Sequence, residues 1–210
     1  MIRPCDRGAL IGLTAAGRMM TRVAPLTGNF HPGDVSASPA GVFVSDSQNG
    51  AVYGYGKSGR GLLPVSRSNT GRSAQGSAMD ADGKQLLVAD YAEGIASVEL
   101  ATGARKLLPR GDGTPLRGID GIARCGPTYY GIYNGTSAGA LVVLTPGATT
   151  LDVSRPLGER PLNDPTQIAY DGKQLLIVSG SGWADIEKQP TRALGATILA
   201  VPLTSDCQVQ

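Results

Sequence analysis

The sequence predicts an all-β fold, a β-propeller of about four four-stranded blades with a half blade before them. Three observations predict it: a repeat of about 44 residues, short apolar runs separated by turn residues, and no segment with a helical period. Repeats of ~40–50 residues that each hold four short strands are typical of propeller blades. We expect residues 1–210 to form this single domain.

The repeat is marked by apolar runs that end in a small polar residue. The run VFVSD ends at Asp46, LLVAD at Asp90, YYGIYN at Asn134 and QLLIVS at Ser179. The string DGKQLL occurs in the second and fourth copies. Recurrence in every blade usually reflects structure, so we expect Asp46, Asp90 and Asn134 to hold turns by hydrogen bonding to nearby backbone.

A second unit follows each first unit after about ten residues. It begins at Ala51, Ala96, Ala140 and, more weakly, Ala196, and ALIGLTAAGRMMTRVAP near the N-terminus is similar to it. Such runs have the length and residue types of strands, and the ADG, NG and TG turns between them suit hairpins. The expected blades cover about 31–73, 74–118, 119–163 and 164–203, with a partial blade at 9–26.

Composition excludes several classes of protein. Charged residues make up only 17% of the chain, and the net charge of +2 comes with no basic face, so we expect no nucleic-acid partner. The sequence contains no run of ~18 apolar residues, so we expect no membrane-spanning helix. The single histidine, His31, argues against a His-rich zinc site and is better placed in a surface loop than as a general base.

The three cysteines stand far apart in the sequence, at Cys5, Cys125 and Cys207. An odd number at wide spacing fits neither a CxxC metal site nor a dense disulfide framework. We expect buried or free thiols, with a Cys5–Cys207 pair as the alternative if the termini meet. The apolar run at 9–16 follows two arginines and could be a secretion signal, but a strand explains it better. The compartment therefore stays open between the cytoplasm and a periplasmic or secreted location.

The segment GIDGIARCGPTYYGIYNG contains an Asp-Gly pair, an apolar strand, a Gly turn and a strand ending in Tyr-Asn-Gly. In this pattern the repeats resemble the gluconolactonase and regucalcin-like family of six-bladed propellers. Two further segments are similar to blades of the family. The preceding blade resembles HPGDVSASPAGVFVSDSQNGAVYGY, and the last blade resembles DPTQIAYDGKQLLIVSGSGW. The resemblance spans about Ala9 to Leu203 and implies a propeller without the family's N-terminal blades.

The resemblance implies one divalent cation, calcium or zinc, held at the channel mouth by a Glu, an Asn and an Asp. Hard oxygen donors suit calcium, and a cation can polarise a lactone carbonyl and lower the pKa of a bound water. Aligned on the repeat, Gly33, Gln75, Asp120 and Thr166 open the innermost strands. Asp120 matches the family's Asp ligand and is the candidate catalytic residue. Gln75 stands in place of the Asn ligand, and the Glu would lie in a blade that this chain lacks.

The resemblance also implies a substrate pocket around the cation. Asp34 matches an Asp beside the family's substrate-binding Asn, which is Gly33 in this sequence. The expected substrate-binding residues are Asp34, Gln75, Thr166 and Trp183. Trp183, the only tryptophan, either packs against the last blade or lines the channel mouth.

Three hypotheses about function follow from these observations. The chain is a metal-dependent sugar-lactone or ester hydrolase with a degraded site, a non-catalytic propeller that binds a small molecule or a protein, or a truncated propeller without activity alone. Unpaired strands at the ends of an open arc of blades would favour self-association.

Overall fold

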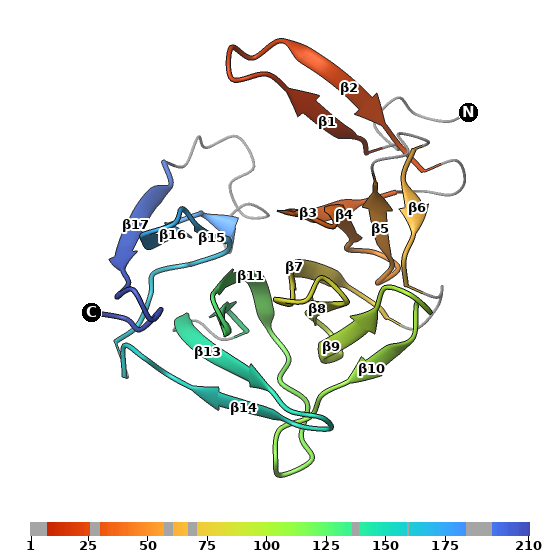
Figure 1. The fold of residues 1–210 in the computed structure, drawn as a ribbon. Coiled ribbons are helices and arrows are strands. Elements are labelled where there is room, and N and C mark those ends of the chain that lie inside the picture. The colour runs from red at the N-terminus through yellow and green to blue at the C-terminus, as the bar shows by residue number, and fades with distance from the viewer. Residues whose placement is uncertain are drawn as a thin grey trace.

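The fold is a β-propeller in the computed structural model, which describes residues 8–25, 30–56, 61–66, 71–135, 139–158, 160–183 and 195–210. These residues form antiparallel sheets in the order of the sequence, arranged as blades around a common axis (Figure 1). The predicted all-β propeller of about four blades with an N-terminal half blade is confirmed.

Each blade is a meander in which neighbouring strands of the sequence pair. The first blade contains β3 (Pro32–Ser38), β4 (Gly41–Asp46), β5 (Val52–Tyr55) and β6 (Leu63–Pro64). The second contains β7 (Ala74–Met79), β8 (Gln85–Asp90), β9 (Gly94–Glu99) and β10 (Arg105–Leu107). The third contains β11 (Ile119–Cys125), β12 (Thr128–Tyr133), β13 (Ala140–Pro146) and β14 (Leu151–Ser154). The fourth contains β15 (Ile168–Tyr170), β16 (Gln174–Ser179) and β17 (Thr197–Pro202).

The half blade is the hairpin of β1 (Leu10–Leu13) and β2 (Met19–Val23), which lies beyond the first blade in Figure 1. Leu10 and Val23 pack against a small apolar cluster of the first blade. Its other apolar side chains are more than half exposed: Ile11, Leu13, Met19 and Met20. The expected self-association through open blade edges stays a prediction.

The core lies between the blades, because each blade buries apolar side chains on both of its faces. Leu86 and Val88 of β8 belong to the cluster shared with the first blade. The intervening residues Leu87 and Ala89 belong to the cluster shared with the third blade. Successive side chains of a strand point to opposite faces, so a continuous apolar run such as LLVA serves both neighbours. Among the described residues, no helix is long and apolar enough to cross a membrane.

The innermost strands β7 and β11 approach so closely that only glycine fits at position 76. A Cβ on Gly76 would lie 2.3 Å from the backbone nitrogen of Ile122 and 2.6 Å from the carbonyl oxygen of Asp120. We expect Gly76→Ala to lower the free energy of unfolding by about 1–3 kcal/mol, because backbone atoms cannot move aside as a side chain would. Urea unfolding measures this. Gly111→Ala, whose Cβ meets nothing within 4 Å, is the control and should change stability little.

The expectation of free or buried thiols is wrong for Cys125 and Cys207, and so is the alternative that Cys5 pairs with Cys207. Cys125 and Cys207 form a disulfide, 82 residues apart in sequence. Cys125 ends β11 and Cys207 follows β17, so the bond joins the third and fourth blades. The chain after β17 turns back on the third blade, where the Tyr130 hydroxyl donates a hydrogen bond to the Cys207 carbonyl. Cys5 lies outside the described residues.

Candidate functional site at the channel mouth

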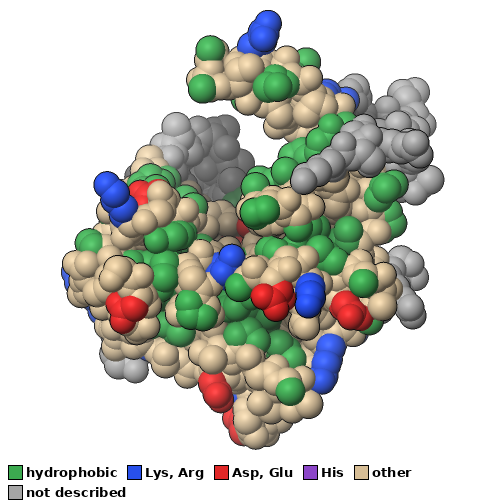
Figure 2. All heavy atoms as spheres, in the orientation of Figure 1, with side chains coloured by type: hydrophobic (Ala, Val, Ile, Leu, Met, Phe, Trp, Pro, Cys, Tyr) green, Lys and Arg blue, Asp and Glu red, His purple; other side chains and the backbone are tan. Residues whose placement is uncertain are grey.

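A cavity of about 360 Å³ lies at the end of the propeller where the innermost strands begin. It is lined from all four blades, by Gly33, Ser73, Gln75, Tyr91, Asp120, Asn134, Thr166, Gln167, Ser181 and Trp183. Four of the residues expected to form the site therefore meet in one cavity: Gln75, Asp120, Thr166 and Trp183. The fifth, Asp34, follows Gly33 on β3 and is not one of the described residues that line the cavity. Figure 2 shows acidic and basic side chains interspersed over one face of the molecule, without a continuous charged patch.

The pairing of the inner strands explains why these positions coincide. The register shifts between Pro32 and Val35 in β3, and at the matching steps of β7 and β11. Gly33, Gln75 and Asp120 each follow the first paired residue of their strand, inside this irregular step. Irregular pairing of this kind re-aims side chains and is common beside functional sites.

Asp120 is held by an amide from the end of β12. Asn134 Nδ2 donates to Asp120 Oδ2 at 3.0 Å and to the carbonyl oxygen of Pro165 at 3.0 Å. Burial raises the pKa of the Asp120 carboxyl, and the hydrogen bond from Asn134 opposes that rise. The carboxylate is thus oriented by a neutral donor and has no cationic partner among the described residues.

Asp34 supplies a second carboxylate close enough to Asp120 for the two charges to interact. Burial raises the pKa of Asp34 to about 6, the backbone hydrogen bond from Val35 lowers it, and the charge of Asp120 raises it further. The Val35 nitrogen donates to Asp34 Oδ1 at 2.7 Å. Two carboxylates that share a partly desolvated site repel each other, and a proton, a cation or a hydroxyl-rich ligand relieves that repulsion.

The raised pKa of Asp34 predicts a specific pH dependence of stability. Between the ordinary value of 3.8 and about 6, the folded chain binds more protons at this carboxyl than the unfolded chain does. The contribution of Asp34 to the free energy of unfolding is therefore complete below pH ~4 and is lost as the pH rises through ~6. We expect Asp34→Asn to be stabilised relative to the parent at pH 7 but not at pH 4, as measured by urea unfolding. An equal difference at both pH values would contradict this assignment.

Asn134 was expected to hold a turn as Asp46 and Asp90 do, and for Asn134 that expectation is wrong. Asp46 Oδ1 accepts the Gln48 nitrogen at 3.0 Å, and Asp90 Oδ1 accepts the nitrogens of Ala92 and Glu93. Strand pairing sets Asp46 opposite Pro32 and Asp90 opposite Ala74, but in the third blade it sets Tyr133 opposite Ile119. Asn134 is therefore one position further along and reaches the channel mouth. The Asn134 Oδ1 atom is buried without a hydrogen-bond partner in the described part of the chain.

The rim of the cavity carries aromatic side chains. Trp183 is 66% exposed, so the expectation that it packs against the last blade is wrong. The backbone nitrogen of Trp183 donates to Ser181 Oγ at 3.3 Å. Tyr91, which sequence reasoning missed, occupies the rim next to Asn134. Burial raises the pKa of the Tyr91 hydroxyl, with a further rise from the charge of Asp120. No motif marks Tyr91, because its place depends on how β8 ends.

The donor set at the mouth consists of oxygen atoms from carboxylates and amides. Gln75 Nε2 donates to Ser73 Oγ at 3.2 Å. In the described ranges, no group of three His, Cys, Asp or Glu side chains is arranged to hold a metal ion. Asp34, Asp120 and the Gln75 amide are of the chemical kind that calcium takes, although they are fewer than its usual 6–8 oxygens. An Asn at position 33 would not fit, because a Cβ on Gly33 would lie 2.8 Å from the carbonyl oxygen of Ala74.

These features define the chain as a β-propeller with a polar cavity at its channel mouth. Solved structures that are similar to the chain support this class. One chain of a nidogen/laminin complex is similar over 90% of this chain, with 16% identity and a TM-score of 0.60. The Pan2 WD40 domain of Neurospora crassa is similar over 98%, with 14% identity and a TM-score of 0.60. A glutaminyl cyclase of Myxococcus xanthus is similar over 88%, with 12% identity and a TM-score of 0.52.

The similarity at these identities concerns the fold alone. This chain spans 65% of the nidogen/laminin chain, 59% of the Pan2 chain and 79% of the cyclase chain. No protein-family model matches the chain. No curated protein matches it either. The resemblance to the gluconolactonase family is not confirmed by these comparisons, and they support neither a hydrolase activity nor a metal site.

Proposed function

We propose that the channel mouth binds a small molecule with several hydroxyl groups, about the size of one sugar. The observation that carries the proposal is the convergence of Gln75, Asp120, Asn134 and Thr166 on one cavity of about 360 Å³. A few convergent polar groups in a concave site of this size are typical of small-molecule binding. The lining offers acceptors for hydroxyl donors and donors for hydroxyl acceptors at close quarters.

Each side chain has a definite task in such a complex. The Asp120 carboxylate accepts hydrogen bonds from ligand hydroxyls, and Asn134 keeps it in place. The amides of Gln75 and Gln167 both accept and donate. Trp183 at the rim offers a flat apolar surface to the less polar face of a ring.

Trp183 also provides the test, because it is the only tryptophan of the chain and lines this cavity. Titration with D-glucose and with D-gluconate is expected to change its fluorescence in a saturable way for at least one of the two. Asp120→Asn should weaken that binding about tenfold, since a hydrogen bond to a charged acceptor is lost. Asp82→Asn is the matched control, because Asp82 is exposed in the turn between β7 and β8. The proposal fails if neither probe alters the emission, or if the Asp82 variant weakens binding as much.

A second candidate is hydrolysis of a sugar lactone assisted by a divalent cation, and the paired carboxylates favour it. Asp34, Asp120 and the Gln75 amide would hold the cation, which would supply a Lewis acid for the lactone carbonyl. Asn134 orients Asp120 through its amide hydrogen bond. Without the cation, burial raises the pKa of Asp34 to about 6, and a bound cation would lower it by favouring the carboxylate.

Turnover separates this candidate from simple binding. Hydrolysis of D-glucono-1,5-lactone is followed with calcium, with zinc and with chelator, over the spontaneous rate. The hydrolase predicts a cation-dependent rate that falls about a hundredfold or more in Asp120→Asn. Binding without turnover under every condition supports the non-catalytic propeller.

A further inference from the structure

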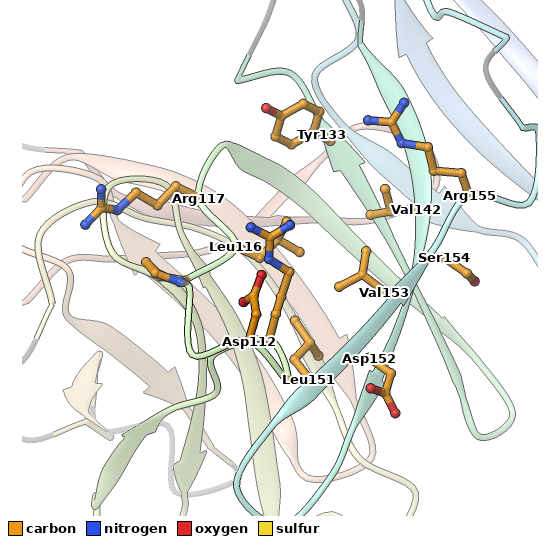
Figure 3. A pocket seen from close by; sticks show the side chains of 13 residues that line it. Asp112, Leu116, Arg117, Tyr133, Val142, Leu151, Asp152, Val153, Ser154 and Arg155 are labelled. Atoms are coloured by element: carbon orange, nitrogen blue, oxygen red, sulfur yellow. The ribbon is translucent and has the colours of Figure 1, made fainter.

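A cleft of about 630 Å³, larger than the cavity at the channel mouth, lies between the second and third blades. Its walls are the loop between β10 and β11 on one side, and β13, β14 and the residue after β14 on the other. Arg110, Arg117 and Arg155 line it, and we call it the arginine cleft. In Figure 3, Arg117 and Arg155 lie on opposite sides, with Leu116, Val142 and Val153 between them.

A relay of hydrogen bonds through Thr114 to Asp112 holds the Arg110 side chain in the arginine cleft. Arg110 donates from Nε and Nη2 to Thr114 Oγ1, at 3.0 and 2.6 Å. The Thr114 hydroxyl donates to Asp112 Oδ1 at 2.6 Å. The relay fixes the Arg110 guanidinium while it leaves three of its five N–H groups for another acceptor. Two carboxylates also line the cleft. Asp112 accepts the hydrogen bond from Thr114, and Asp152 is exposed on β14.

The floor of the arginine cleft is apolar. Leu116, Val142 and Leu151 are buried beneath it, and Val153 packs against the same cluster. Tyr133 forms the wall toward the channel mouth. Its ring lies against Gly118, since a Cβ built on Gly118 would be 3.3 Å from a ring carbon of Tyr133. The next residue, Asn134, already belongs to the channel mouth, so the two cavities adjoin but have different linings.

We infer that the arginine cleft binds an organic anion that carries a carboxylate or phosphate group on an apolar body. Guanidinium groups bind both kinds of anion through paired, charge-assisted hydrogen bonds. The partly buried side chains of Val153 and Tyr133, which pack on the buried cluster, receive the apolar body. This site is independent of the function proposed for the channel mouth.

Calorimetry with four probes tests the inference: phenyl phosphate, 3-phenylpropanoate, inorganic phosphate and benzyl alcohol. We expect saturable binding of phenyl phosphate, phenylpropanoate or both, at least tenfold tighter than inorganic phosphate and benzyl alcohol. Which of the two binds identifies the anionic group. Because the channel mouth is separate, Trp183 fluorescence should not change.

Variants locate the binding in the arginine cleft. Arg110→Gln and Arg117→Gln should each weaken it about tenfold or more. Val153→Asp, which places a negative charge at the floor, should abolish it. Arg22→Gln on the exposed face of β2 removes the same charge elsewhere and should leave the affinity unchanged. The inference is overturned if inorganic phosphate binds as tightly as phenyl phosphate, if neither organic anion binds, or if Arg22→Gln has the same effect as Arg110→Gln.

Discussion

The Asp90→Ala variant is expected to lose about 3–5 kcal/mol of unfolding free energy. Asp90 is 1% exposed, and its carboxylate accepts the backbone nitrogens of Arg72, Ser73, Ala92 and Glu93 at 2.7–3.2 Å. It also pairs with Arg105 Nη2 at 3.3 Å. Alanine would leave these backbone groups without their acceptor and take one carboxylate away from a buried guanidinium.

Urea unfolding followed by circular dichroism measures this loss, with Asp82→Ala as the control. Asp82 is exposed in a turn of the same blade, so its removal should change stability by less than ~0.5 kcal/mol. Asp90→Asn should fall between the two, since the amide keeps one acceptor oxygen but has no charge for Arg105. A loss below ~1 kcal/mol in Asp90→Ala would show that the turn does not depend on this side chain.

The repeat made the fold predictable because every blade has the same structural requirements. An inner strand must fit between two others, the next strand must bury both faces, and a polar side chain must close the turn that follows. Leu86 to Ala89 shows this, because four successive apolar residues supply two different clusters. The 44-residue spacing of Asp46 and Asp90 marks the same turn in two blades.

The candidate site was predictable where it follows the repeat. Gln75 and Asp120 occupy matching steps of β7 and β11, so alignment of the repeats alone places them together. Asn134 was misjudged because strand pairing sets Tyr133, and not Asn134, at the position that Asp46 and Asp90 occupy in their blades, which the letters Asp, Asp and Asn conceal. The structure, through the contact of Asn134 with Asp120, shows this difference.

Other features depend on contacts that no repeat specifies. The arginine cleft joins a loop after β10 with the end of β14, and the three arginines have no common position in the repeat. The disulfide depends on the path of the last residues, after the repeat has ended. Spacing in the sequence carries no information about either.

Loss of the Cys125–Cys207 disulfide is the second change with a large expected effect. Removal of a cross-link that closes a loop of this order costs about 2–5 kcal/mol, on the view that the bond restricts the unfolded chain. The two cysteines are 82 residues apart, and both are buried. We therefore expect a reductant to lower the midpoint of thermal unfolding by several degrees or more.

The double variant Cys125→Ala and Cys207→Ala separates the bond from other effects of the reductant. Its midpoint should match that of the reduced parent approximately and should not move when reductant is added. A shift of the variant by reductant would assign the effect to another group, and an unshifted parent would show that the bond contributes little.

The disulfide is also expected to affect ligand binding at the channel mouth, because the fourth blade supplies Thr166 and Trp183 to that cavity. Cys125 lies at the end of β11 opposite to Asp120, so the disulfide fixes the fourth blade to the third at a distance from the cavity. If the bond keeps these blades in register, reduction should weaken ligand binding at Trp183 even below the unfolding transition. Unchanged affinity in the reduced, folded chain would mean that the apolar contacts between Ile132, Leu141, Leu175 and Ile177 hold the blades together by themselves.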